Sequence, residues 1–364
     1  MADRALVLTD FDYELPAELI AQEPAGVRGE SRLLMVAGRT GRAGKAGGTE
    51  AGGRVGGWAG EFRDGVFGDL VSLIPAGDLL VLNSTRVRHA RLLGTRPSGG
   101  EAEVLLIHPG TDDTWIAMGR PGSAMRPGKR ITLSADVFVE TVEVLEDGNR
   151  VVRFVGASAE EAIERFGQLP LPPYITHAPN EVDEERYQTV YARREGSVAA
   201  PTAGLHFTPA LLDRLAEGGV QIADLDLEVG PGTFKPVDSD DLSAHAMHAE
   251  RYEVPAALVR AVAQTRATGG SVWAVGTTVV RALESAADEH GNLREGISET
   301  ALFVTPGYRF RVVDHLITNF HLPRSTLLML VSAFAGHEQT MDAYRHAVAQ
   351  RYRFYSYGDA MVVL

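Results

Sequence analysis

The chain contains no cysteine among its 364 residues. Disulfide bonds and thiolate metal sites are therefore excluded, and this composition agrees with an intracellular protein. No apolar run reaches the roughly 18 residues that a membrane helix needs. Residues 1–13 carry three aspartates and no long apolar stretch, which is unlike a signal peptide. We therefore expect a cytoplasmic protein that has no membrane partner and acts as a monomer.

Positive charge is scarce: 35 Lys and Arg face 48 Asp and Glu, which gives a formal net charge of -13. Such a balance does not favour nucleic acid binding unless a local surface is basic. Residues 86–153 carry 10 basic against 9 acidic residues, so the acidity is confined to the rest of the chain. This region is the less repulsive one for a polyanion. Its candidate contacts are Arg86, Arg126, Lys129 and Arg130.

The order of the expected elements divides the chain into two parts. Residues 88–155 read as short strands separated by Gly, Pro and Asp, which predicts a small all-β barrel domain. Residues 1–87 and 156–364 read as alternating strands and helices, which predicts an α/β domain resembling a (β/α) barrel. The β domain is then an insertion into the α/β domain. Residues 38–60 are rich in Gly and Ala and predict a flexible loop.

Residues 198–208 combine a histidine and two threonines with an otherwise small, apolar run. Thr208 and Pro209 are typical of a helix start, so His206 is expected just before a helix N-terminus. Backbone amides at such an end favour anions, which makes Thr202, Gly204 and His206 candidates for binding a ligand with a carboxylate. The alternative is an ordinary turn in which the histidine only satisfies a backbone group.

Polar and Gly-rich segments follow three further expected strands. Ligands of α/β proteins bind at the carboxyl ends of strands, so these segments predict one shared site. Glycines there allow close approach of the backbone to a ligand. The candidate binding residues are Gly230, Gly232, Thr233 and Phe234 after the first strand, Gly276, Thr277, Thr278, Arg281 and Glu284 after the second, and Asn319, His321, Ser325 and Thr326 after the third.

The segment 245–250 invites a metal interpretation because His245, His248 and Glu250 lie close together in sequence. With His206 and His321 they would supply enough ligands for zinc or iron. Their spacing, however, matches none of the standard zinc motifs. The alternative is that these side chains hydrogen-bond a polar ligand.

Eight segments together closely resemble one enzyme family. They are LPPYI (171–175), YQTVYA (187–192), SVAAPTAGLHFT (197–208), VGPGTFKPV (229–237), HAMHAERYEV (245–254), AVGTTVVRALES (274–285), LITNFHLPRSTLLMLVSAFAG (316–336) and YRFYSYGDAM (352–361). The family is that of the S-adenosylmethionine:tRNA ribosyltransferase-isomerases of queuosine biosynthesis. The match extends to LIAQEP, SRLL and DLLVLNSTRV near the start and so covers nearly the whole chain.

The resemblance implies that the ribosyl part of S-adenosylmethionine is transferred to 7-aminomethyl-7-deazaguanine in tRNA and isomerised. Epoxyqueuosine forms, adenine and methionine are released, and no metal is needed. The reaction requires acid–base groups and groups that hold ribose and a carboxylate. We expect acid–base chemistry from His206, His248, His321 and Glu250, and substrate binding from the polar residues named above. The basic residues of the β domain would then contact tRNA.

Three departures from the family pattern leave other functions open. They are the Gly-rich segment 38–60, Gly122–Gly128 without the family's usual lysine, and Glu228 where the family has histidine. One alternative is a paralogue that uses S-adenosylmethionine with a small-molecule acceptor. Others are a metal-dependent hydrolase and a binding module without catalysis.

Overall fold

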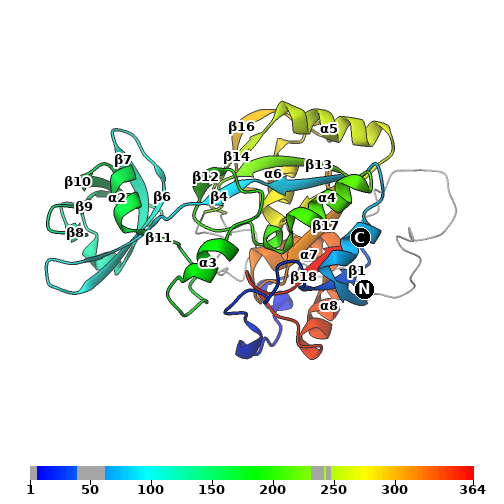
Figure 1. Cartoon of the computed structure of the whole chain (residues 1–364), viewed down its shortest axis with the longest axis horizontal. Coiled ribbons are helices and arrows are strands. Elements are labelled where there is room, and N and C mark those ends of the chain that lie inside the picture. Colours follow the sequence, from blue (N-terminus) through cyan, green and yellow to red (C-terminus); the bar gives the residue numbers. More distant parts are fainter. Residues whose placement is uncertain (1–5, 39–61, 231–241, 243–246) are drawn as a thin grey trace.

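The computed structural model describes residues 6–38, 62–230, 242 and 247–364. Two large β-sheets dominate this part of the chain, and they lie apart from one another (Figure 1). The larger sheet is covered by helices, whereas the smaller one forms the lobe at the left of the figure. The expectation of a mixed α/β protein is confirmed at this level.

The larger sheet has nine strands and a mixed order. Its four neighbouring strands β13, β3, β15 and β17 are parallel, so their carboxyl ends meet at one edge. The strands across the sheet are β16 (Gly296–Thr300), β14 (Glu250–Val254), β13 (Gln221–Leu227), β3 (Leu79–Asn83), β15 (Val272–Val275), β17 (His315–Asn319), β18 (Ala360–Val363), β1 (Arg32–Val36) and β2 (Phe62–Val66).

Helices cover both faces of this sheet because its central strands are apolar on both sides. Alternate residues of β3 belong to different cores: Leu80 and Leu82 pack with α1 and α4, while Leu79 and Val81 pack with the remaining helices. The first face carries α1 (Leu70–Leu73) and α4 (Pro209–Glu217), and the second carries α5 (Ala256–Ala267), α6 (Thr277–Ala286), α7 (Thr326–Ala335) and α8 (His337–Ala349).

The smaller sheet closes on itself because β5 pairs with β6 on one side and with β8 on the other. Its core contains Trp115, Met125 and Val152. The helix α2 (Ala159–Phe166) packs beside it and begins with a capping box of Ser158 and Glu161. Its strands are β5 (Arg91–Thr95), β6 (Glu101–Pro109), β7 (Thr114–Arg120), β8 (Arg130–Thr132), β9 (Phe138–Val144), β10 (Arg150–Val155) and β11 (Gly167–Gln168).

Short elements connect the two sheets. The strand β4 (Thr85–Val87) follows β3 directly and pairs in parallel with β12 (Arg194–Ser197). The helix α3 (Glu181–Arg186) lies near this connection (Figure 1) and is capped by the Asn180 side chain.

Two expectations about the fold are wrong. The larger sheet is open, with β16 and β2 at its edges, whereas a (β/α) barrel would pair its outermost strands. The reason is that β14, β16, β18 and β2 add antiparallel pairings, which alternate strands and helices alone do not reveal. The apolar run Leu302, Phe303 and Val304 predicts a short strand from the sequence, but these residues have no regular structure. The expected loop 38–60 lies outside the described residues except for Gly38.

Candidate active site

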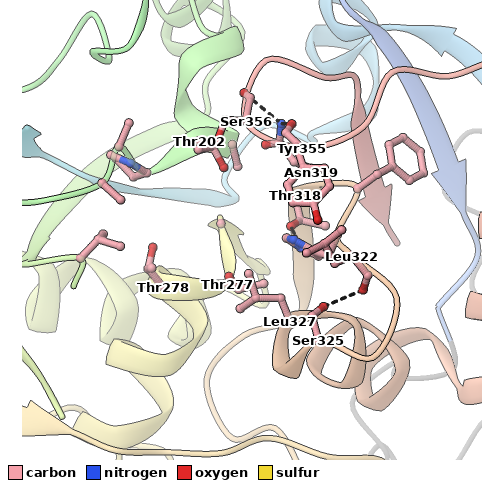
Figure 2. Close-up of a pocket in the computed structure, with 18 of the residues that line it drawn as sticks. Thr202, Thr277, Thr278, Thr318, Asn319, Leu322, Ser325, Leu327, Tyr355 and Ser356 are labelled. Carbon is pink, nitrogen blue, oxygen red and sulfur yellow. Dashed lines mark hydrogen bonds between the residues drawn. The ribbon is translucent and has the colours of Figure 1, made fainter. Parts of the chain in front are cut away.

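A cavity lies at the carboxyl ends of β13, β15 and β17. Its empty volume is about 760 Å³ including the open solvent at its mouth. Figure 2 shows polar side chains from several elements around it. Lining residues are Tyr174, 199–203, Val229, 276–278, 318–322, Ser325, Leu327, Tyr355 and Ser356. The structure therefore brings together three of the segments that the sequence placed at one site: 198–208, 276–278 and 319–325.

Two helices begin at this cavity. Gly276 precedes α6 with a φ of 93°, a conformation that favours glycine, and its amide donates to the Ile317 carbonyl at 2.7 Å. It offers no capping side chain, so the first-turn amides of α6 suit an anionic ligand. Ser325 caps α7 by accepting from the Leu328 amide at 3.2 Å. The side chains of Thr277 and Thr278 add hydroxyl groups to the same wall (Figure 2).

His321 lines the cavity and is 9% exposed. Its Nε2 atom lies 2.8 Å from the Thr318 hydroxyl. The backbone of His321 is held on both sides, because its amide donates to the Tyr344 hydroxyl at 3.0 Å and its carbonyl accepts from the Tyr13 hydroxyl. Burial lowers the pKa of His321 to about 3. The imidazole is therefore neutral near pH 7 and held in a fixed position.

His206 lies behind the cavity wall rather than in it. It is the last residue of the 3-10 helix η5 (Thr202–His206), whose Thr202 and Ala203 do line the cavity. The ring packs against Phe67 with centroids 4.9 Å apart, and its Nδ1 atom lies 2.8 Å from the Ser31 hydroxyl. Burial lowers the pKa of His206 to about 4.

Part of the cavity wall is aromatic. Tyr174 and Tyr355 pack with centroids 4.1 Å apart, and the Tyr174 hydroxyl is hydrogen-bonded to the Ser356 hydroxyl. Asn319 supports this wall, because its Nδ2 atom donates to the Tyr355 carbonyl at 2.9 Å and reaches the Ser356 carbonyl at 3.5 Å. A planar ring could pack against the two tyrosines.

Arg281, Glu250 and Glu284 are buried away from the lining residues. Arg281 and Glu250 form an ion pair whose side chains are 5% and 6% exposed, and Arg281 also donates to the Leu302 carbonyl at 3.0 Å. Glu284 accepts backbone amides, including Val312 and Val313 at 2.9 and 3.0 Å. Burial raises the pKa of Glu284, whereas these amides lower it. Glu250 and Glu284 therefore accept hydrogen bonds from groups of the protein itself, as buried carboxylates usually do, and they stabilise the neighbouring loops.

Several other expected site residues lie outside the cavity. The Gly230 amide donates to Glu250 at 3.1 Å, and a Cβ at Gly204 would collide with the Tyr191 hydroxyl, so Gly204 is a packing glycine. Thr326 opens α7 beside Ser325, and His248 precedes β14. Gly232, Thr233, Phe234 and His245 fall outside the described residues.

Glu228, expected at the border of the site, pairs with Arg251 through atoms 3.0 Å apart. It lies in a separate depression with Arg194, Asp226 and Glu253. Burial, followed by the Glu228 charge, raises the pKa of Asp226 to about 6. The structure therefore gives Glu228 an ionic role beside β13 and does not bring it to the cavity lining.

The candidate basic contacts lie on or beside the smaller sheet. Arg86, Arg126, Lys129 and Arg130 are all exposed. Arg130 pairs with Glu140 at 2.8 Å, and Arg86 lies 4.0 Å from Glu195. Exposed pairs of this kind are weak and can exchange for another anion.

Clusters of metal-binding side chains and membrane-spanning helices are both absent from the described residues. No group of three His, Asp or Glu side chains there could hold a metal ion. Among the same residues, no helix is long and apolar enough to cross a membrane.

Sequence reasoning missed the aromatic wall. Tyr174, Tyr355 and Ser356 belong to segments that carried the family resemblance, LPPYI and YRFYSYGDAM, but no strand or helix start marks them. They reach the cavity through irregular loops. A useful signal would have been the dense tyrosines of residues 352–357 in a chain with only 7% aromatic residues.

Comparisons with known proteins agree with the family resemblance. Residues 8–363 match the family model described as "Queuosine biosynthesis protein". The S-adenosylmethionine:tRNA ribosyltransferase-isomerase of Thiobacillus denitrificans is 52% identical over 354 residues, 97% of this chain and 96% of that protein. The protein of the same name from Symbiobacterium thermophilum is 51% identical, covering 98% of this chain and 99% of its own length.

A solved structure is also similar. The crystal structure of S-adenosylmethionine tRNA ribosyltransferase from Thermotoga maritima shares 35% identity and a TM-score of 0.53, and the match covers 98% of this chain and 100% of the other. The resemblance stated from the sequence motifs is thereby confirmed. Its relatives from Thiobacillus denitrificans, Symbiobacterium thermophilum and Thermotoga maritima carry the name of an S-adenosylmethionine:tRNA ribosyltransferase. This chain therefore belongs to the queuosine biosynthesis protein family.

Proposed function

We propose that this enzyme transfers and isomerises the ribosyl moiety of S-adenosylmethionine to 7-aminomethyl-7-deazaguanine in tRNA. Epoxyqueuosine is formed, and adenine and methionine are released. The names of the relatives support the reaction class. The single observation that supports the site is the cavity, whose lining combines the N-termini of two helices with two packed tyrosines.

The two ends of the cavity suit the two ends of the co-substrate. The methionine carboxylate is expected at the first turn of α6, where Thr277 and Thr278 supply hydroxyl groups beside uncapped amides. A purine or deazapurine ring is expected against Tyr174 and Tyr355. Thr202 and Ser325 also line the cavity and suit ribose hydroxyls (Figure 2).

His321 is the proposed acid–base residue. Among the described residues it is the histidine that lines the cavity, and its neutral imidazole can accept a proton. A pKa near 3 gives little driving force for proton abstraction near pH 7. A carboxylate bound at the neighbouring helix ends would raise this pKa toward the working range, because an opposite charge favours the imidazolium form.

Two domains with separate roles are part of the proposal. Because α2 and β11 pack on the smaller sheet, we place the end of the inserted barrel after β11 instead of at residue 155. Residues 1–87 and 169–364 would then form the catalytic domain, and residues 88–168 the inserted barrel. Arg126, Lys129 and Arg130 on the barrel, with Arg86 at the connection, would contact tRNA phosphates. A tRNA substrate supports a cytoplasmic location.

Adenine release tests the function. The protein is incubated with S-adenosylmethionine and tRNA that carries the aminomethyl base, and adenine is measured by chromatography. Matched reactions contain unmodified tRNA or the free base. Release only with the modified tRNA supports the proposal. Release with the free base alone would favour a small-molecule acceptor, and no release in any reaction would refute both.

A further inference from the structure

His206 carries the feature that points beyond the proposed reaction. Its Nε2 atom is buried, and no hydrogen-bond partner lies within ordinary geometry. The Oδ1 atom of Asn319 is also buried without a hydrogen-bond partner. Buried polar atoms without partners are uncommon in folded proteins, because each loses its hydrogen bonds to water. Two such atoms on neighbouring elements therefore call for a joint explanation.

The other contacts of both side chains fix which atoms remain. The Tyr355 and Ser356 carbonyls can only accept hydrogen bonds, so the Asn319 amide must point its Nδ2 donor toward them. The Oδ1 atom of Asn319 then points the other way and remains an acceptor without a donor. His206 has its Nδ1 atom 2.8 Å from the Ser31 hydroxyl. If that hydroxyl donates, the neutral imidazole carries its proton on Nε2 and becomes the donor that Asn319 lacks.

The two side chains lie on elements that contact each other, because η5 ends at His206 and packs against β17, which ends at Asn319. The Asn319 side chain also raises the pKa of His206, against the larger lowering by burial. We propose that His206 is a positioning residue: its Nε2–H group donates to Asn319 Oδ1 and thereby holds the Tyr355–Ser356 wall of the cavity. The chain of contacts runs from Ser31 through His206 and Asn319 to the loop at residues 355–356. His206 does not itself exchange a proton with the substrate.

The location of the chain explains how it acts. Phe67 packs on the His206 ring with centroids 4.9 Å apart, so the imidazole cannot swing toward the cavity without losing this contact. Asn319, Tyr355 and Ser356 all line the cavity. Removing the donor frees Asn319 to rotate and releases its hold on two backbone carbonyls. The effect reaches substrate binding first, since Tyr355 belongs to the aromatic wall.

Three substitutions at one position test this role. His206→Gln keeps an N–H group near the Nε2 position, His206→Asn offers an amide only near Nδ1, and His206→Ala offers neither. We expect kcat/KM for S-adenosylmethionine to stay within about threefold in the Gln variant and to fall roughly tenfold or more in the other two, mainly through KM. Asn319→Ala should match His206→Ala, and the double variant should be no worse than either.

The inference would be overturned if kcat fell equally in all three His206 variants and one limb of the pH–rate profile disappeared. That result would indicate acid–base catalysis by His206. Thermal unfolding of each variant separates loss of the contact from loss of the fold.

This inference rests on the proposed function only for its kinetic readout. If the wild-type protein releases no adenine, the proposed function fails, and ¹⁵N NMR of the imidazole still decides the inference. The His206 signals, identified by their loss in His206→Gln, should show a neutral ring protonated on Nε2 at pH 6. The Nε2 shift should change in Asn319→Ala. A ring protonated on Nδ1, or an Nε2 shift unaffected by that substitution, would refute the hydrogen bond.

Discussion

Histidines whose pKa is lowered by desolvation should make this protein sensitive to acid, and the half-buried His315 allows the cleanest measurement. It begins β17, far along the strand from the cavity, and its ring packs on Trp273 with centroids 4.2 Å apart. Burial lowers the pKa of His315 to about 4, while the Asp78 charge acts weakly in the opposite direction. We predict that His315→Gln reduces the dependence of stability on pH.

The sign follows from comparing the folded and unfolded chains. Below about pH 6.5 the unfolded chain binds a proton at this histidine, whereas the folded chain remains neutral until about pH 4. Stability contributed by the neutral form is therefore complete above the unfolded pKa and is lost as the pH falls between these values. The slope is about 1.4 kcal/mol per pH unit for one proton, so the loss from pH 7 to pH 5 is roughly 2 kcal/mol.

The assay is urea unfolding at several values from pH 7 to pH 5. Near pH 5.5 the free energy of unfolding of His315→Gln should fall less steeply than that of the wild type, by about 1 kcal/mol per pH unit. His290→Gln is the control, because the His290 side chain is 75% exposed, and its slope should equal that of the wild type. Parallel curves for wild type and His315→Gln would refute the reasoning, even if the variant is less stable at every pH.

Four further predictions use other parts of the structure. Arg281→Met should lower the free energy of unfolding by about 3–5 kcal/mol in urea titrations, because Glu250 is left as a buried, unpaired charge, and a loss below about 1 kcal/mol would contradict this. Ser325→Ala should cost about 1 kcal/mol through the lost α7 cap, with Ser325→Asp as the rescuing control. Arg126→Ala should weaken tRNA binding and reduce its salt dependence by about one phosphate contact; an unchanged salt slope would exclude this arginine. Deleting residues 40–57 should leave adenine release nearly unchanged, because loop-closure entropy changes slowly with length, whereas lost tRNA binding would assign them a contact.

The positions of the helices and the parallel strands could be predicted from the sequence because both follow local patterns. The apolar run after Asp78 predicts a strand at residues 78–82, which appears as β3. The helix expected from Pro209 appears as α4 with Thr208 as its cap. The grouping of residues 276–278 and 319–325 at one site could be predicted because the carboxyl ends of parallel strands meet at the same edge of a sheet, where ligands bind. These predictions needed no knowledge of which strands are neighbours.

Local patterns could not predict whether the larger sheet is open or closed, nor which individual side chains are buried. Antiparallel strands such as β14 and β16 are set by partners distant in sequence, so the open sheet looked like a barrel. His206 and His321 both follow similar Gly- or Asn-containing segments, yet one faces Ser31 and Phe67 and the other faces the cavity. Local sequence does not distinguish a histidine that contacts the substrate from one that supports its neighbour.

The position of β18 has a consequence for how the protein is made. Residues 360–363 are the last strand of the larger sheet to be synthesised, yet they lie between β17 and β1 and are fully buried. Until they leave the ribosome, β1 and β2 have no connection to the rest of the sheet, and two strand edges stay open to other chains. Completing the sheet closes a loop of more than 320 residues, so this step of folding is expected to be slow. A chain that stops before residue 360 would therefore contain the other eight strands of the larger sheet but would lack the strand that joins β1 and β2 to them.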